Sequence, residues 1–427
     1  MRNHVQNLLL KTIGWVALAP VALAFSLGAM TVDQRFFVPF LERNPLIGER
    51  KSCAVNLQPY ILLADKSFNE YGEECELFAY DGAAYGLRYL DDAVVASGRR
   101  NTSLIKSEWQ SKLLDGPYIT RGRMVGKGIA FTAYFSPRSC FGFGGRIGAM
   151  EVDSELELIR DTTSFDAVVN GYGDEQELIA LQSSLHQALD LEPACWQGSG
   201  STDAELFARL YFDRDYFLWC RYISLGAEIG AVLPTGRKRD IANPASLPFG
   251  NPGFGWYFEG SAEVLLKKDI WFFLIGRVQK RFATSDLNER MSIEREPWRF
   301  GSLVGSLWVN PGFTFALSPY IVFEGMRDGL GFRVGYTLVW HAKDRVLPVA
   351  YEPVVQNKQP EMTRYQDASE WGSERVHAGV LYDFSRGKKI RGWEPVIAAT
   401  VDVPTAWFVG KRSFKSFGIS IGLETSF

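Results

Sequence analysis

The chain has 427 residues, a formal net charge of −3 and a sequence pI near 6.0, which excludes the strongly basic character of most nucleic-acid-binding domains. After residue 30, no apolar run reaches the roughly 18–20 residues that a membrane-spanning helix needs. Aromatic residues nevertheless make up 14% of the chain, and the mean hydropathy is −0.08. A soluble all-β chain of this length usually divides into several domains, whereas a barrel with lipid at every second strand residue suits this composition as one domain.

The first thirty residues have the pattern of an export signal. A short basic start precedes an apolar stretch, residues 13–24, which Pro20 interrupts and which ends in a small-x-small cleavage site. We therefore expect a signal peptide over residues 1–24, or 1–29 if cleavage is later, and one mature domain over residues 30–427. A single transmembrane helix is the alternative, but the proline and the short apolar length disfavour it.

Beyond the signal, apolar residues alternate with small or polar ones through many segments of strand length. Leu330, Phe332 and Val334, for example, share one face of such a segment, because successive side chains of a strand lie on opposite faces. The repeated pattern predicts a transmembrane antiparallel β-barrel of about twelve strands. The expected strands cover residues 54–64, 118–136, 141–153, 204–212, 217–233, 254–266, 270–282, 303–325, 330–341, 374–384, 393–403 and 414–427.

The expected strand at 303–325 is the least regular. Splitting it at Pro319 would give thirteen strands, but its odd positions stay apolar through Phe323, so one long strand keeps its phase. Pro311 and Pro319 are awkward in a paired strand, and we expect bulges there.

Two connections are long enough to contain helices. Residues 174–191 carry acids in their first turn and apolar residues at helical spacing, and residues 81–98 end in a Ser-Gly stop. These segments lie in the connections 65–117 and 154–203. We expect the two loops to fold partly into the barrel as a constriction, although a simple cap over the mouth is the alternative.

The last twelve residues alternate most regularly and stop on an aromatic. Phe417, Ile419 and Ile421 face one way, small or polar residues face the other, and the chain ends at Phe427. This tail resembles bacterial outer-membrane β-barrel proteins, in which the barrel-assembly machinery reads the terminal phenylalanine. The resemblance implies export through the periplasm of a Gram-negative cell to the outer membrane, with membrane lipid and that machinery as partners. It names no function and implies no cofactor.

Connection lengths give the chain a direction. The short connections are 137–140, 213–216, 267–269, 326–329 and 385–392. The connections at the alternate junctions, among them 65–117 and 154–203, are longer. Short periplasmic turns opposite long external loops are typical of outer-membrane barrels. The even strand count then brings both ends of the barrel to the periplasmic side.

The faces expected to point inward carry charges of both signs. These residues are Arg146, Arg209, Glu228, Glu259, Glu263, Arg277, Arg281, Glu324, Arg333, Asp383 and Glu424. Charges that face water in a lumen set ion selectivity, whereas charges in a closed lumen pair with one another. A twelve-stranded barrel is wider than the eight-stranded kind that side chains fill. A modest aqueous pore and a lumen obstructed by loops are both consistent with this lining.

Cysteines and histidines are few. Cys75 and Cys195 fall in the two long external loops, so oxidising conditions favour a disulfide between them, with two unpaired thiols as the alternative. His341 and His377 fall on neighbouring strands and face inward. Two histidines without a third ligand make a poor metal site, and we expect no metal, cofactor or catalytic site.

These features predict a porin-like channel for small polar solutes, with no nucleic acid as a partner. A structural or adhesive barrel, sealed by loops 65–117 and 154–203, is one rival. A barrel hydrolase that uses His341 or His377 as its base is the other.

Overall fold

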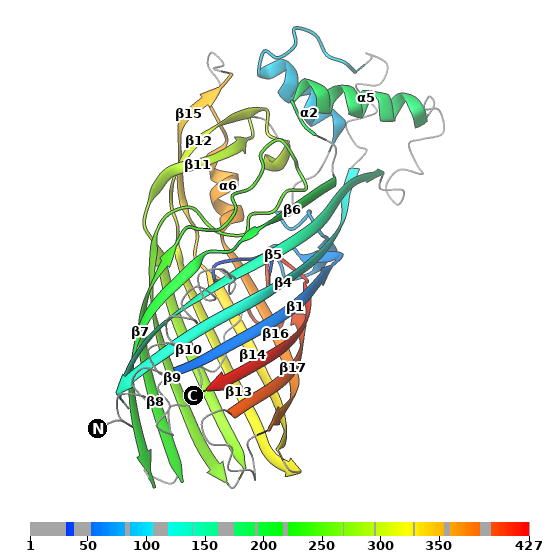
Figure 1. Ribbon diagram of the computed structural model, residues 1–427. Coiled ribbons are helices and arrows are strands. Elements are labelled where there is room, and N and C mark those ends of the chain that lie inside the picture. Colours follow the sequence, from blue (N-terminus) through cyan, green and yellow to red (C-terminus); the bar gives the residue numbers. More distant parts are fainter. Residues whose placement is uncertain are drawn as a thin grey trace, which may run out of the picture.

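The computed structural model describes residues 31–37, 53–81, 86–105, 118–138, 140–160, 175–192, 195–216, 221–267, 269–293, 296–327, 329–353, 359–384 and 394–426. Within them, 12 strands close into one antiparallel barrel (Figure 1), as the alternation predicts. In pairing order they are β1 (Cys53–Ala64), β4 (Tyr118–Arg138), β5 (Phe141–Arg160), β7 (Ala204–Asp215), β8 (Tyr222–Leu233), β9 (Gly255–Lys267), β10 (Ile270–Arg281), β13 (Phe313–Arg327), β14 (Leu330–His341), β16 (Trp371–Asp383), β17 (Glu394–Thr405) and β19 (Phe417–Ser426). Ala54 pairs with Ser426 and closes the ring. The expected signal peptide lies outside the described residues and stays a prediction.

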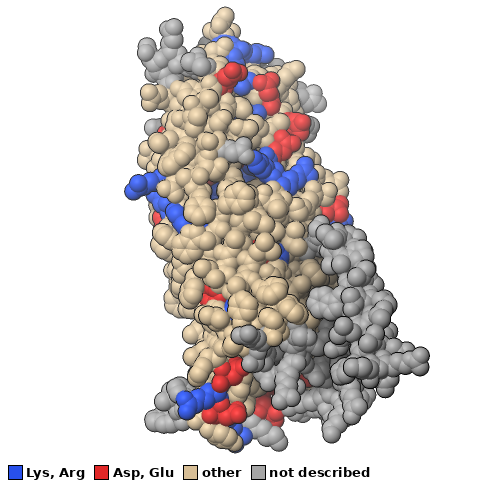
Figure 2. Space-filling model, turned by 60° about the vertical axis from the view of Figure 1, so that its left-hand side comes forward, with Lys and Arg blue, Asp and Glu red and all other residues tan. Residues whose placement is uncertain are grey.

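The outer surface of the barrel is apolar. On β19, Phe417, Ile419 and Ile421 are exposed, whereas the small residues between them are buried on the inner side. Figure 2 shows a band across the middle of the molecule with few charged side chains, between charged regions at both ends. A bilayer covers such a band, and every backbone group of the wall is paired within a closed barrel. No helix among the described residues is long and apolar enough to cross a membrane.

Short turns and long loops alternate as expected, so the barrel has a turn end and a loop end. The turns join β4 to β5, β7 to β8, β9 to β10, β13 to β14, and β16 to β17. The expected strand 141–153 is longer than predicted, because the outer half of β5 pairs with β6 (Cys195–Ser201). β6 continues into β7 after Thr202 and Asp203, so one edge of the wall extends beyond the loop end.

The expected single strand 303–325 is wrong, and so is the alternative split at Pro319. The chain breaks at Pro311 and Gly312 instead, while β13 runs through Pro319 opposite Leu274. Pro311 has no N–H to donate to a neighbouring strand, and the Gly312 N–H bonds the Asp344 carboxylate at 2.7 Å. The barrel keeps twelve strands because β12 (Leu303–Asn310) leaves it.

β12 belongs to a separate sheet above the loop end, between β11 (Thr284–Met291) and β15 (Arg345–Glu352) (Figure 1). Its odd residues are apolar because Leu303, Leu307 and Val309 pack with Met291 and Val346. The odd residues of β13 are apolar because they lie on the outer surface of the barrel. One continuous pattern therefore has two different physical causes.

The long loops form a cap. Helices α2 (Leu87–Ala96) and α5 (Glu175–Ala188) confirm the two expected helices and lie above the loop end (Figure 1). Leu90 of α2 and Leu185 of α5 share one buried core with the inner face of β1, β4 and β5. Strands β2 (Lys66–Phe68), β3 (Glu74–Glu76) and β18 (Ser413–Phe414) form a small sheet beside this core. Helix α6 (Met362–Ser369) and the 3-10 turn η1 (Trp298–Phe300) complete the described helical elements.

The obstruction of the lumen comes from residues 31–37, which sequence analysis did not single out. Val32 is buried against inward-facing residues of β13, β14 and β16. The carbonyl of Phe37 accepts a hydrogen bond from Arg375 at 3.1 Å, and that of Phe36 accepts one from Ser416 at 2.9 Å. We call residues 31–37 the lumen segment. The described parts of loops 65–117 and 154–203 cover the mouth, and this segment fills part of the bore below them.

Candidate functional site in the lumen

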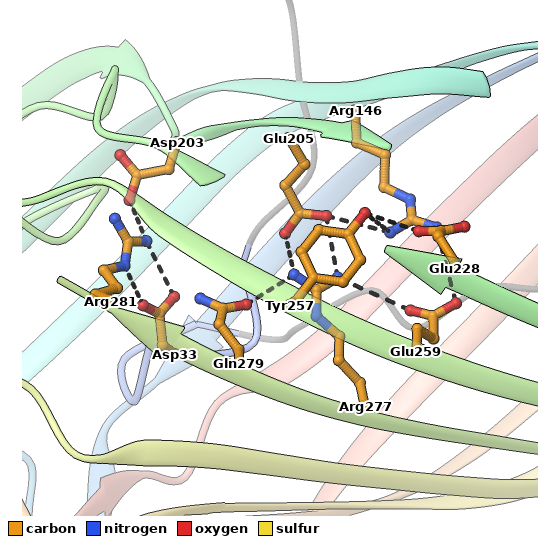
Figure 3. Close-up of polar contacts among 10 residues, drawn as sticks. All are labelled: Asp33, Arg146, Asp203, Glu205, Glu228, Tyr257, Glu259, Arg277, Gln279 and Arg281. Carbon is orange, nitrogen blue, oxygen red and sulfur yellow. Dashed lines mark hydrogen bonds and ion pairs between the residues drawn. The ribbon is translucent and has the colours of Figure 1, made fainter. Parts of the chain in front are cut away.

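Charged side chains from five neighbouring strands meet on the inner wall (Figure 3). Strand register brings them together, because Arg146 pairs with Glu205, Arg209 with Glu228, and Arg277 with Glu259. We call this set the wall network; its members are Arg146, Glu205, Arg209, Glu228, Tyr257, Glu259 and Arg277. Alternation alone aims each of these side chains at the lumen.

Arg277 is the centre of the wall network. Its two terminal nitrogens bond both carboxylate oxygens of Glu205, at 3.0 and 2.5 Å, in a bidentate pair. Its guanidinium also lies 3.6 Å from the centre of the Tyr257 ring. Arg146 bonds Glu205 at 3.2 Å and Glu228 at 3.0 Å, which joins the strands into one polar wall.

The wall network is almost entirely removed from water. The side chains of Arg277 and Glu228 are 2% and 0% exposed. Buried charges are tolerated only when they are paired, because each loses several kcal/mol of hydration. At this level the lumen therefore has the paired lining of a closed bore rather than the water-exposed lining of an open pore.

A second cluster, at the loop end of β10, holds the lumen segment in place. Arg281 bonds Asp33 at 2.5 Å and Asp203 at 2.6 Å (Figure 3). It also donates to the Asn251 carbonyl at 2.8 Å. The Asn251 side chain in turn donates to the Asp33 carbonyl at 2.8 Å. We call these four residues the clasp, because they tie the lumen segment, the β6–β7 junction and the loop after β8 to the wall.

A cavity of about 140 Å³ lies beside the clasp, toward the loop end. The lumen segment, the loop 238–252, the ends of β10, β13 and β14, and the turn η1 bound it. We call it the mouth cavity. Charged, amide and aromatic side chains all contribute to its lining.

The structure brings most of the predicted lining residues together and leaves four apart. Arg146, Arg209, Glu228, Glu259 and Arg277 form the wall network, Arg281 anchors the clasp, and the buried Glu263 lies on the same strand as Glu259. The other four lie on the remaining strands: Arg333 donates to Thr400 at 2.8 Å, and Glu324, Asp383 and Glu424 lie toward the turn end.

Sequence reasoning missed four residues of the site. Glu205 and Tyr257 have the same strand parity as Arg209 and Glu259, so a complete reading of the alternation would have found them. Asp33 and Asp203 lie outside regular strands, where no period indicates which way a side chain points.

The expected disulfide is not formed. Cys75 and Cys195 are both free thiols. Cys75 lies in the small β2–β3 sheet, 3.2 Å from the Ser67 hydroxyl, whereas Cys195 begins β6 opposite Glu155 of the barrel wall. Two different sheets therefore hold the two cysteines.

The two histidines are not brought together. His341 bonds Thr314 at 2.7 Å and Asp344 at 2.9 Å, so both of its ring nitrogens are engaged. His377 pairs with Gly335, six strand positions away, and its ring meets Tyr320 edge-on. Among the described residues, no three His, Cys, Asp or Glu side chains are arranged to hold a metal ion.

No protein-family model and no curated protein matches the chain, whereas several solved structures are similar to it. An outer membrane channel from Pseudomonas putida F1 is similar at a TM-score of 0.48 and 11% identity, over 90% of this chain and 100% of that one. A Pseudomonas aeruginosa FadL homologue has a TM-score of 0.34 and 8% identity, over 89% and 91% of the two chains. The Pseudomonas putida toluene transporter TodX has 0.31 and 10%, over 94% and 96%. Likeness of this degree carries no conclusion about activity.

Proposed function

We propose that this protein is an outer-membrane channel for small polar solutes, closed at rest by its lumen segment. The observation that carries the proposal is the combination of a closed barrel, apolar outside and polar inside, with a short separate segment across its bore. A wall that is only structural has no need of a segment that fills its bore without joining its sheet. The lumen segment is held by side chains and is not hydrogen-bonded into the barrel wall as a strand, so it can be displaced while the hydrogen-bonded wall stays intact.

The clasp is the natural point of release. Its strongest contact is the ion pair of Asp33 with Arg281, and the Arg281 side chain has a second carboxylate partner in Asp203. Removing Asp33 therefore takes away the one ion pair of the clasp that holds the lumen segment and leaves its contacts with Arg375 and Ser416, while Arg281 stays paired with Asp203. The barrel itself should fold normally.

Conductance in planar bilayers tests this proposal. We expect wild-type protein to open rarely, and Asp33→Ala to open in discrete steps at least tenfold more often. Asp153→Ala is a matched control, since Asp153 is an exposed carboxylate on β5 and should leave the opening frequency unchanged.

One observation favours a different function. The wall network is buried and its charges are mutually paired, which also suits a sealed barrel with a structural role. If folded Asp33→Ala protein shows no openings in bilayers, the channel proposal is rejected in favour of that role.

A further inference from the structure

The mouth cavity has the size of a small ligand. Its volume is 140 Å³, and an apolar protein cavity of about 150 Å³ is large enough to admit benzene. Phe36, Trp298 and Trp371 contribute flat apolar surface to its lining. A single ring or a short aliphatic body therefore fits the space.

Buried hydrogen-bond donors without acceptors surround this space. Gln34 and Gln279, which are 2% and 1% exposed, each leave the side-chain Nε2 unpartnered within the part of the chain that the structure describes. Arg239, whose side chain is 3% exposed, leaves Nε and Nη2 unpartnered there as well. All three residues line the cavity. A buried donor without a partner is unfavourable, so three such residues around one cavity favour a ligand that accepts hydrogen bonds.

The orientation of Gln279 follows from its neighbour. Arg277 donates to the Gln279 side-chain oxygen at 2.7 Å, and a guanidinium has only donors. The amide oxygen must therefore face Arg277, and the amide nitrogen points the other way, toward the Asp33 side (Figure 3).

Within the described residues, the acidic groups of the cavity are already engaged, whereas the side-chain nitrogens of Gln34 and Gln279 and two nitrogens of Arg239 are not. Glu289 binds Arg239 at 2.6 Å, Asp33 belongs to the clasp, and Asp344 accepts from His341 at 2.9 Å. Basic residues outnumber them: Arg35, Lys238, Arg239, Arg281 and Arg299 also line the cavity. Arg299 is buried and donates hydrogen bonds to two backbone carbonyls and to the hydroxyl of Tyr80. It forms no ion pair among the described residues. The local field therefore favours an anion.

We propose that the mouth cavity binds a small carboxylate with an apolar body of about one ring. The carboxylate accepts from Gln34, Arg239 and Gln279, and the body lies among Phe36, Trp298 and Trp371. The cavity adjoins the clasp of the proposed channel, so a role of the bound anion as the transported solute rests on the proposed function. The binding of the anion does not rest on it.

Isothermal titration calorimetry on the full-length protein in detergent tests the site, with benzoate as the probe. Benzyl alcohol has a similar size without the charge, and inorganic phosphate has charge without the apolar body. We expect benzoate to bind at least tenfold more tightly than either. Equal binding of benzyl alcohol would overturn the role of the donors, and tighter binding of phosphate would overturn the role of the aromatic walls.

The variant Gln34→Leu removes donors that make no other bond, so it should leave folding intact. Benzoate affinity should fall about tenfold, the size expected for one hydrogen bond to a charged group. Gln197→Leu, on the exposed face of β6, is the matched control and should leave affinity unchanged. Unchanged affinity in Gln34→Leu would reject the site.

Calorimetry and conductance distinguish the two proposals. Benzoate binding without bilayer openings would reject the channel and keep the site. Openings of Asp33→Ala without benzoate binding to wild-type protein would reject the site and keep the channel.

Discussion

The wall network and the mouth cavity are adjacent but differ in their balance of basic and acidic groups. In the wall network, each arginine faces a carboxylate from a neighbouring strand. Both regions contain buried donors without a hydrogen-bond partner among the described residues, but around the mouth cavity the basic residues outnumber the carboxylates. A balanced buried set stabilises a rigid wall, whereas an unbalanced set is stabilised only when an acceptor arrives. Buried charge in this lumen therefore has two roles, and its position along the bore decides which.

Removing Arg277 should have the largest effect on stability, because it leaves Glu205 without its bidentate partner inside the wall. We expect Arg277→Met to lower the free energy of unfolding by about 3–5 kcal/mol. Urea titration of the protein in lipid vesicles, followed by tryptophan fluorescence, measures this loss.

Arg333→Met is the control for that prediction. Arg333 donates to the neutral hydroxyl of Thr400, so its loss leaves no unpaired carboxylate and should cost about 1.5–3 kcal/mol, less than the loss of Arg277. Adding Glu205→Gln to Arg277→Met should cost less than Glu205→Gln alone, since the two residues are coupled. Equal losses in the two arginine variants would contradict the distinction between the wall network and the rest of the lining.

Sequence reasoning succeeded where a repeating environment imposes a period, and failed elsewhere. Lipid outside and polar side chains inside give every barrel strand the same alternation, so strand number and most of the wall network could be predicted. The single strand predicted over 303–325 was wrong, because the core of the β11–β12–β15 sheet imposes the same two-residue period as lipid does on the barrel strands. Gln34, Asp33 and Arg239 could not be found, because their roles depend on segments that meet only in the folded chain.

The stability of the cap should depend on pH through a buried histidine. Burial against Phe300 lowers the pKa of His186, on α5, from 6.5 to about 4. Because the folded pKa lies below the unfolded one, neutral His186 stabilises the cap fully above about pH 6.5. This stabilisation is lost as pH falls toward 4. Hydrogen exchange of α5, corrected for intrinsic rates, should therefore quicken between pH 7 and pH 4.5.

His186→Phe separates this titration from general acid effects. Phenylalanine keeps the ring contact with Phe300 but binds no proton, so exchange in α5 should no longer depend on pH in that range. If the variant loosens as much as wild-type protein does, carboxylates elsewhere in the cap carry the pH dependence and His186 does not.

The smallest expected effect concerns the thiols of the cap. Cys195 is exposed, whereas Cys75 is half-buried, and burial raises the pKa of its thiol. Since the thiolate is the reactive form, a maleimide at pH 7.5 should label Cys195 several-fold faster than Cys75 in variants that each keep one of the two. Mass spectrometry of the intact wild-type chain, without reductant, should find both sites labelled. A peptide pair linked through Cys75 and Cys195 would instead restore the disulfide and tie the loop edge of the wall to the cap. The cap would then be covalently anchored to β6, and opening at the clasp would have to occur beneath a fixed cover.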